Sequence, residues 1–345
     1  MINIGIAAAC SFVVSVLGMP LLIRWLAAKG IGQPIRSDGP AAHHAKKGTP
    51  TMGGMMIVLA AVIGYVVPHL RQELPFSRGG LLVVWAFVGA GAVGLADDWI
   101  KVTRKRSLGL NKRAKLAGQL IVAGVFAFGA MAWANVQQVL GFSRWNMPGW
   151  KLPAAMFVVA IILVIMGASN GVNLTDGLDG LAAGSSVYAF LAYAVMCFWM
   201  FRNPATYNVP QALDLAVVAS ALVGGCLGFL WWNAAPARIF MGDVGALAIG
   251  AAFGALSVLT YTQLLLPIIG GLFVIETLSV ILQVGSFRLF NKRRILRMAP
   301  IHHHFELGGW PETTVIIRFW IVAMILVAVG IGFFFADFIS LSAKG

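Results

Sequence analysis

Charged residues are scarce in this sequence. Of its 345 residues only 11% are Asp, Glu, Lys or Arg, whereas 59% are hydrophobic and the mean hydropathy is +0.86. A soluble domain carries about 25% charged residues, so the composition excludes an ordinary water-soluble protein. The long apolar runs predict an all-α integral membrane protein, because a helix satisfies its own backbone hydrogen bonds in lipid.

Cysteine and acidic residues are also few. The three cysteines, Cys10, Cys197 and Cys226, lie inside apolar runs without metal-ligand spacing, which predicts small buried side chains. Twelve acidic residues against 25 basic ones leave a net charge of +13. The cations lie beside apolar runs, and no soluble domain offers a groove for nucleic acid. We therefore expect no nucleic acid partner, but anionic lipid of the inner leaflet and a phosphate-bearing substrate.

Ten segments have the apolar length of about 20 residues that a membrane span needs. The first is followed by Arg24, which indicates a retained span rather than a cleaved signal peptide. Apolar character is almost unbroken at residues 263–267, so two spans or one long kinked span fit there. No linker or repeat divides the chain, which predicts one polytopic domain over residues 1–345. The predicted spans are 4–23, 52–70, 79–97, 115–135, 153–170, 181–201, 211–231, 243–262, 264–286 and 314–338.

The basic residues predict the orientation. One alternate set of connections holds 19 of the 25 Lys and Arg residues and the other set holds 6. The positive-inside rule places the richer set in the cytoplasm. An even number of spans then puts both termini outside, and the five polar segments described next fall on the cytoplasmic side.

The most polar of these segments, residues 169–183, separates two long apolar runs. It contains Asn170, Asn173, Asp176 and Asp179 together with three glycines. Irregular polar backbone is not tolerated against lipid, so the segment must meet water or line a cavity. Asn and Asp near a membrane are candidates for function, while the alternative is a hydrophilic turn.

Two further segments supply carboxylates. Asp97 and Asp98 end one apolar run, and Lys101 shares a helix face with Asp98. The pair could bind a divalent cation or act as a base, or could simply form a solvated helix end. Asp243, between Gly242 and Gly245, could be another ligand or the N-cap of the helix that follows.

The last two segments supply histidines and lysines. Three consecutive histidines, His302, His303 and His304, cannot easily converge on one zinc ion and suit phosphate contacts or proton handling better. Lys47 precedes a glycine-bearing loop that is not a Walker motif but could contact phosphate. Carboxylates, cations and histidines on one face predict Mg²⁺-dependent chemistry on a phosphate-bearing substrate.

These segments, in this order, resemble the polyprenyl-phosphate N-acetylhexosamine-1-phosphate transferase superfamily, and within it the phospho-N-acetylmuramoyl-pentapeptide transferases. The resemblance implies transfer of phospho-MurNAc-pentapeptide from UDP-MurNAc-pentapeptide to undecaprenyl phosphate, giving lipid I and UMP in peptidoglycan synthesis. It also implies Mg²⁺ as cofactor, a homodimer and a place in the bacterial inner membrane. The matching segments are Lys47-Gly-Thr-Pro-Thr-Met-Gly-Gly, Asp97-Asp98-Trp-Ile-Lys101, residues 169–181, residues 233–243 and Pro300-Ile-His-His-His-Phe-Glu306.

Roles follow from the resemblance residue by residue. Asp243 resembles the metal ligand, Asp97 the base for the lipid phosphate, and Asp98 a group that supports metal or lysine. Contacts to the diphosphate or the transition state are implied for Lys101, Lys115, His302, His303 and His304. Contacts to the nucleotide and sugar phosphate are implied for Lys47, Asn170, Asn173, Asp176, Gly177, Leu178, Asp179, Asn233 and Phe240.

Two other functions and two mechanisms stay open at this point. A sister transferase would make an N-acetylglucosamine lipid instead. A transporter would also place polar residues near spans, but it would put them near the midplane and often show inverted repeats. The transfer could take one step, with the lipid phosphate attacking directly, or two steps, with a carboxylate such as Asp243 as nucleophile.

Overall fold

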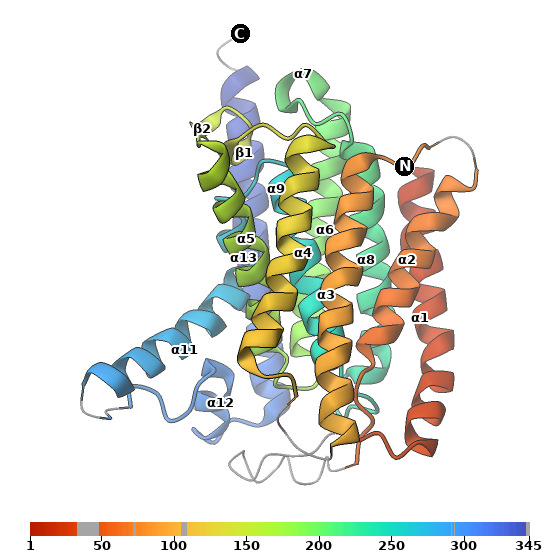
Figure 1. Ribbon diagram of the computed structural model, residues 1–345, viewed down its shortest axis with the longest axis vertical. Helices are drawn as coiled ribbons and strands as arrows, with labels where there is room; N and C mark the ends of the chain where they lie inside the picture. The colour runs from red at the N-terminus through yellow and green to blue at the C-terminus, as the bar shows by residue number, and fades with distance from the viewer. Residues whose placement is uncertain (33–47, 72–73, 105–108, 291, 293, 343–345) are drawn as a thin grey trace.

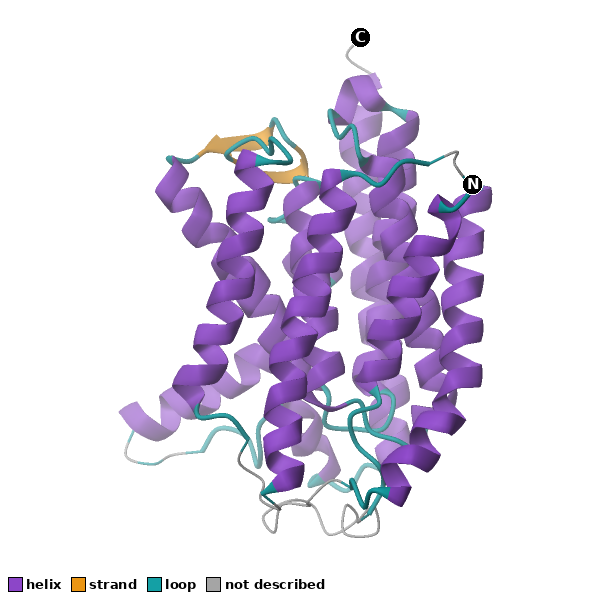
Figure 2. Ribbon diagram, turned by 45° about the vertical axis from the view of Figure 1, so that its right-hand side comes forward, coloured by secondary structure: helices purple, strands orange, loops and turns teal. Residues whose placement is uncertain are grey.

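The fold is a bundle of helices that run between two ends of the molecule, with one small hairpin (Figures 1 and 2). The structure is a computed structural model and describes residues 1–345 except 33–47, 72–73, 105–108, 291, 293 and 343–345. The elements are α1 (Ile2–Ala28), α2 (Gly54–His69), α3 (Arg78–Thr103), α4 (Lys112–Ala132), β1 (Val139–Arg144), β2 (Met147–Lys151), α5 (Ala154–Thr175), α6 (Leu181–Arg202), α7 (Pro204–Tyr207), α8 (Ala212–Asn233), α9 (Gly242–Leu259), α10 (Leu266–Ile269), α11 (Gly271–Leu289), α12 (Ile301–Glu306) and α13 (Glu312–Ser342).

The prediction of an all-α, multi-pass membrane protein is confirmed. Within the described residues, nine helices are long and apolar enough to cross a bilayer: α1, α3, α4, α5, α6, α8, α9, α11 and α13. The apolar helix α2 has 16 residues and is shorter. With α2 included, the helices follow the ten predicted spans in order. The uncertain join resolves into two helices, because α9 ends at Leu259 and α11 begins at Gly271.

The centre of the bundle is formed by α6, α8 and α9. Between 78% and 89% of the residues in their most apolar windows are buried inside the protein, against 22% for α1. Small residues dominate α8 and α9, which lets neighbouring backbones approach closely. Lipid offers little hydrophobic drive for helix association, so such close packing is what holds membrane helices together.

The β1–β2 hairpin was not predicted. It lies at the same end of the molecule as both chain termini (Figure 1). The hairpin covers the turn between α9 and α10, since the Gly141 N–H donates to Gln263 Oε1 and the Leu264 N–H donates to Gly141 O. Asp337 on α13 accepts from Arg144 and from Ser143 of β1. These bonds explain why the apolar chain turns back at this point.

A second polar network at this end ties α2, α3 and α8 together. Asp214 accepts hydrogen bonds from the Tyr65 hydroxyl and from the Ser77 N–H, each at 2.9 Å. His69 Nε2 lies 2.9 Å from Asp214 Oδ1, and the His69 ring stacks on Phe76. Ser77 also caps α3 by accepting from the Gly80 N–H. The carboxylate therefore fixes the end of the short helix α2.

The opposite end carries the ends of α3 and α5 and the starts of α4 and α9, and there α11 leans away from the bundle (Figure 1). Asn111 caps α4, since Asn111 Oδ1 accepts from the Ala114 N–H at 2.7 Å. A small second core packs α12 and α13 against α11 and the turn after α5, through Leu178, Leu181, Leu272 and Phe319. The candidate site lies at this end.

Candidate active site

Three carboxylates from two helices meet at this end of the bundle. Asp97 and Asp98 come from the last two turns of α3, and Asp243 comes from the first turn of α9. Their nearest oxygens all lie within 4.8 Å of one another. Asp97 and Asp98 are almost fully buried. The structure thus brings together the three aspartates that the sequence singled out.

Close approach of α3 and α9 makes this meeting possible. Gly94 lies one turn before the aspartates of α3, and a Cβ atom on it would overlap the backbone of Asp243. Gly242 has a φ of +72° and faces Asp98, so a side chain there would be strained and would strike the carboxylate. Two glycines therefore set the separation of the carboxylates.

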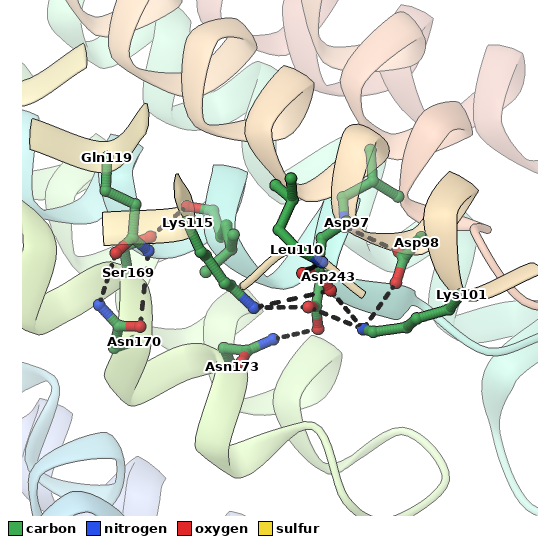
Figure 3. A network of polar contacts seen from close by, with 12 residues as sticks. Asp97, Asp98, Lys101, Leu110, Lys115, Gln119, Ser169, Asn170, Asn173 and Asp243 are labelled. Carbon is green, nitrogen blue, oxygen red and sulfur yellow. Dashed lines mark hydrogen bonds and ion pairs between the residues drawn. The ribbon is translucent and has the colours of Figure 1, made fainter. Parts of the chain in front are cut away.

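Two lysines offset part of the charge of the three carboxylates. Lys101 Nζ lies 2.6 Å from Asp97 Oδ2, 3.1 Å from Asp98 Oδ1 and 2.9 Å from Asp243 Oδ2. Lys115 on α4 lies 2.6 Å from the same oxygen of Asp243, so Asp243 stands between the two lysines (Figure 3). Adjacent carboxylates repel unless a positive charge lies among them. The position among the three aspartates, which the Lys101 ammonium occupies, therefore favours a positive charge.

Neutral donors fix the remaining carboxylate oxygens. Asn173 Nδ2 donates to Asp243 Oδ1 at 2.7 Å, the Leu110 N–H donates to Asp97 Oδ1, and the Val244 N–H donates to Asp98 Oδ2. Asp243 is not the N-cap of α9, since Met241 holds that position and no side chain caps it. The N-cap interpretation was wrong because the helix already begins at Gly242, which places Asp243 inside the first turn. A carboxylate there still benefits from the helix dipole.

One turn deeper, a pair of amides links α4 to α5 (Figure 3). Asn170 Nδ2 donates to Gln119 Oε1 at 3.1 Å, and Ser169 Oγ donates to the carbonyl of Leu247 on α9. Gln119 is buried four residues after Lys115. Asn170 therefore faces Gln119. The sequence did not predict a role for Gln119, because a single Gln in an apolar run does not indicate which residue it contacts.

The turn after α5 lies against the start of α9. Burial together with the nearby Asp243 and Asp98 charges raises the pKa of Asp176 to about 8. Leu178 is buried in the second core. Asp179 Oδ2 accepts from the Ala237 N–H. This turn, residues 176–180, is hereafter the α5–α6 turn.

Asn233 and Phe240 join this turn to the neighbouring loops. The buried Asn233 accepts from the Gly180 N–H and donates to the Ile239 carbonyl. The Phe240 N–H donates to Pro50 O at 2.8 Å, and the Gly53 N–H donates to Phe240 O. The glycine-bearing loop before α2 is thus bound to the loop before α9. Lys47 lies outside the described residues.

The three histidines of α12 face different partners. His302 is fully buried against the α5–α6 turn, where a Cβ atom on Gly177 would meet its Nε2. His303 Nδ1 lies 2.6 Å from Glu306 Oε2. His304 Nδ1 accepts from the Arg297 N–H at 3.0 Å. Of the three rings, His302 is the one for which a contact with the turn that leads to the carboxylates is described.

Comparison with known proteins identifies the family. Residues 80–261 match glycosyl transferase family 4. A phospho-N-acetylmuramoyl-pentapeptide-transferase of Cutibacterium acnes is 48% identical over 98% of this chain and 99% of its own length. Proteins of the same name from Frankia casuarinae (50% identical, 97% of this chain, 98% of that protein) and Streptomyces avermitilis (49%, 93% and 94%) are similar over nearly their whole length.

The chain belongs to the phospho-N-acetylmuramoyl-pentapeptide-transferase family. The resemblance predicted from the polar segments is confirmed, and it extends across the apolar helices between them. Membership makes this chain a multi-pass membrane transferase. The family match at residues 80–261 covers both carboxylate-bearing segments and Lys115.

Proposed function

We propose that this protein transfers phospho-MurNAc-pentapeptide from UDP-MurNAc-pentapeptide to undecaprenyl phosphate, forming lipid I and releasing UMP. The observation that carries the proposal is the convergence of Asp97, Asp98 and Asp243 with two lysines in a member of this family. Transfer between two phosphates requires mainly positioning and neutralisation of charge, and this cluster supplies both.

Mg²⁺ is the cofactor that the donor set fits best. The three carboxylates lie within 4.8 Å of one another, and the Lys101 ammonium already occupies the space among them. Magnesium prefers a few carboxylates plus phosphate oxygens. Asp98 and Asp243 are the proposed ligands. When bound, the ion would neutralise diphosphate charge, while Lys101 and Lys115 supply the same neutralisation from the protein.

The hydrogen bonds of Asp243 favour transfer in one step. Its two oxygens are held by Lys101, Lys115 and Asn173. Such charge-assisted bonds lower the electron density available for attack on phosphorus, which suits a ligand better than a nucleophile. We propose that Asp97 accepts the proton of the lipid phosphate, which then attacks directly. A covalent phospho-sugar enzyme captured by rapid quenching would contradict this order.

The proposed reaction takes place at the cytoplasmic face of the bacterial inner membrane. The basic connections support this orientation, since Arg104, Lys112 and Arg113 lie at the carboxylate end. The nucleotide sugar would arrive from water and the lipid phosphate sideways from the leaflet, whose anionic headgroups the basic residues attract. We also propose that the protein acts as a homodimer, as the resemblance implies.

The decisive experiment is a transfer assay with purified protein in detergent, titrated with Mg²⁺. Release of UMP is expected with UDP-MurNAc-pentapeptide and undecaprenyl phosphate together, and with neither substrate alone. UDP-N-acetylglucosamine in place of the muramoyl substrate should give no product. Turnover with UDP-N-acetylglucosamine and undecaprenyl phosphate, but not with the muramoyl substrate, would identify the sister activity. No UMP release with either nucleotide sugar would contradict the transferase proposal.

A further inference from the structure

One buried carboxylate has no part in the site described so far. Glu276 lies in the second turn of α11, within a helix apolar enough to span the membrane, and its side chain has no exposed surface. A buried charge is costly unless it is paired, and ionisable residues in such helices usually mark a function. The Glu276 carboxylate therefore requires a physical explanation.

The explanation lies in α12. His302 Nδ1 lies 3.1 Å from Glu276 Oε2, and neither side chain is exposed. Within the part of the chain that the structure describes, neither the two carboxylate oxygens nor the two ring nitrogens have a hydrogen-bond partner, so the two side chains meet as an ion-pair contact. Among the described residues, His302 is thus the one charged or titratable partner within ion-pair distance of Glu276. The pair joins α11 to α12 across the edge of the second core.

The other side of the His302 ring meets the α5–α6 turn. Nε2 lies where a Cβ atom on Gly177 would be. The preceding residue, Asp176, lies close to Asp243 at the start of α9. A carboxylate 3.1 Å from Nδ1 in a buried setting attracts the ring and restrains its orientation. Contacts therefore run from Glu276 through His302 and the turn to the start of α9.

We propose that Glu276 is a positioning residue, which holds His302 so that the α5–α6 turn keeps the shape needed to bind the nucleotide sugar. The inference rests on the proposed function, in which Asp176, Gly177 and Asp179 belong to the sugar-nucleotide side. A carboxylate that merely filled space would be replaceable by Leu or Gln without effect on binding, since buried ion pairs often add little to stability.

The kinetic test uses Glu276→Gln and Glu276→Leu in the full-length protein. We expect KM for UDP-MurNAc-pentapeptide to rise about tenfold, the effect of losing one charged contact, while KM for undecaprenyl phosphate stays the same. His302→Asn should give a similar rise, and Glu276→Gln should add little to it. Unchanged KM values, equal rises for both substrates, or fully additive effects would overturn the proposal.

A matched control and a measurement without substrate distinguish failure of this inference from failure of the proposed function. Ser279→Ala removes a buried hydroxyl one turn along α11 that donates to the Glu276 backbone carbonyl, so its kinetics should match the wild type. Hydrogen exchange of residues 173–183 should quicken in both Glu276 variants and not in Ser279→Ala. Unchanged exchange would refute the positioning role even in a protein that transfers no sugar phosphate.

Discussion

At the scale of single residues, the site is a partly buried arrangement of opposite charges, in which Asp97 and Asp98 are buried and both lysines keep some exposed surface. Lys101 contacts all three aspartates and Lys115 contacts Asp243. Removing one charge from such a cluster unbalances the others, because a buried unpaired charge is costly. The side chains therefore act as one unit, and single substitutions should have large effects on turnover.

Substitution of the aspartates tests this unit. Asp97→Asn, Asp98→Asn and Asp243→Asn should each lower kcat by at least about 100-fold, within the range for a lost acid–base or charged group. Each variant should still elute as a folded protein in size-exclusion chromatography. Asp337→Asn, at the other end of the molecule, is the control and should retain turnover. Near-normal kcat in any site variant would exclude that aspartate from the chemistry.

Asp176 predicts a dependence of stability on pH. Its pKa is raised from 3.8 to about 8 by burial and by neighbouring carboxylates. The Asp176 carboxyl thus keeps its proton in the folded protein up to about pH 8, whereas in the unfolded chain it loses the proton above about pH 4. Its contribution to the free energy of unfolding is therefore complete below pH 4 and is lost as the pH rises towards 8. The melting temperature in EDTA should fall over this window relative to Asp176→Asn. A constant difference between the two proteins would contradict the raised pKa.

At the scale of secondary structure elements, the crossing of α3 and α9 determines the site. Gly94 and Gly242 allow the two helices to approach until Asp243 lies beside Asp97 and Asp98. The amide pair Gln119–Asn170 then fixes α4 against α5 one turn deeper in the bundle. The carboxylate geometry is therefore a property of helix packing as much as of the aspartates.

Gly94→Ala tests the crossing. The added methyl group would overlap the Asp243 backbone, and overpacking of this kind costs about 1–3 kcal/mol. We expect transfer activity to fall at least about tenfold, with a lower melting temperature. Gly124→Ala in α4 is the matched control, because its Cβ would meet nothing within 4 Å. It should keep full activity, and equal behaviour of both variants would refute the packing argument.

At the scale of the whole molecule, the polar features are divided between two ends. The hairpin, the Asp214 network and both termini lie at one end, and the carboxylates lie at the other (Figure 1). The distribution of Lys and Arg predicts which end faces the cytoplasm. This orientation is open to direct measurement.

Cysteine labelling in vesicles measures the orientation. In a background without Cys10, Cys197 and Cys226, a membrane-impermeant thiol reagent should label Met147→Cys in right-side-out vesicles, because that hairpin residue is exposed. Arg113→Cys, exposed at the start of α4, should react only in inside-out vesicles. The reverse labelling pattern would show the opposite orientation and would contradict the proposed cytoplasmic site.

The sequence predicts the features that its local pattern encodes. Apolar runs of sufficient length located the spans, and the polar breaks located Asp97, Asp98 and Asp243. What a local pattern cannot encode is the partner of an isolated polar residue in an apolar run, which is why Gln119 and Glu276 were missed. The division between α9 and α11 was left open for the same reason, since hydrogen bonds from the distant β1 strand hold the turn there.

The shortness of α2 has a consequence for the surrounding lipid. Sixteen residues extend over about 24 Å at about 1.5 Å per residue, less than the hydrocarbon thickness of about 30 Å. The Asp214 network fixes the end of the helix. Tilting would not compensate for the short length, because it reduces the distance that a helix spans along the membrane normal. The bilayer must therefore become thinner beside α2, and lipids with shorter acyl chains should gather along that flank of the enzyme.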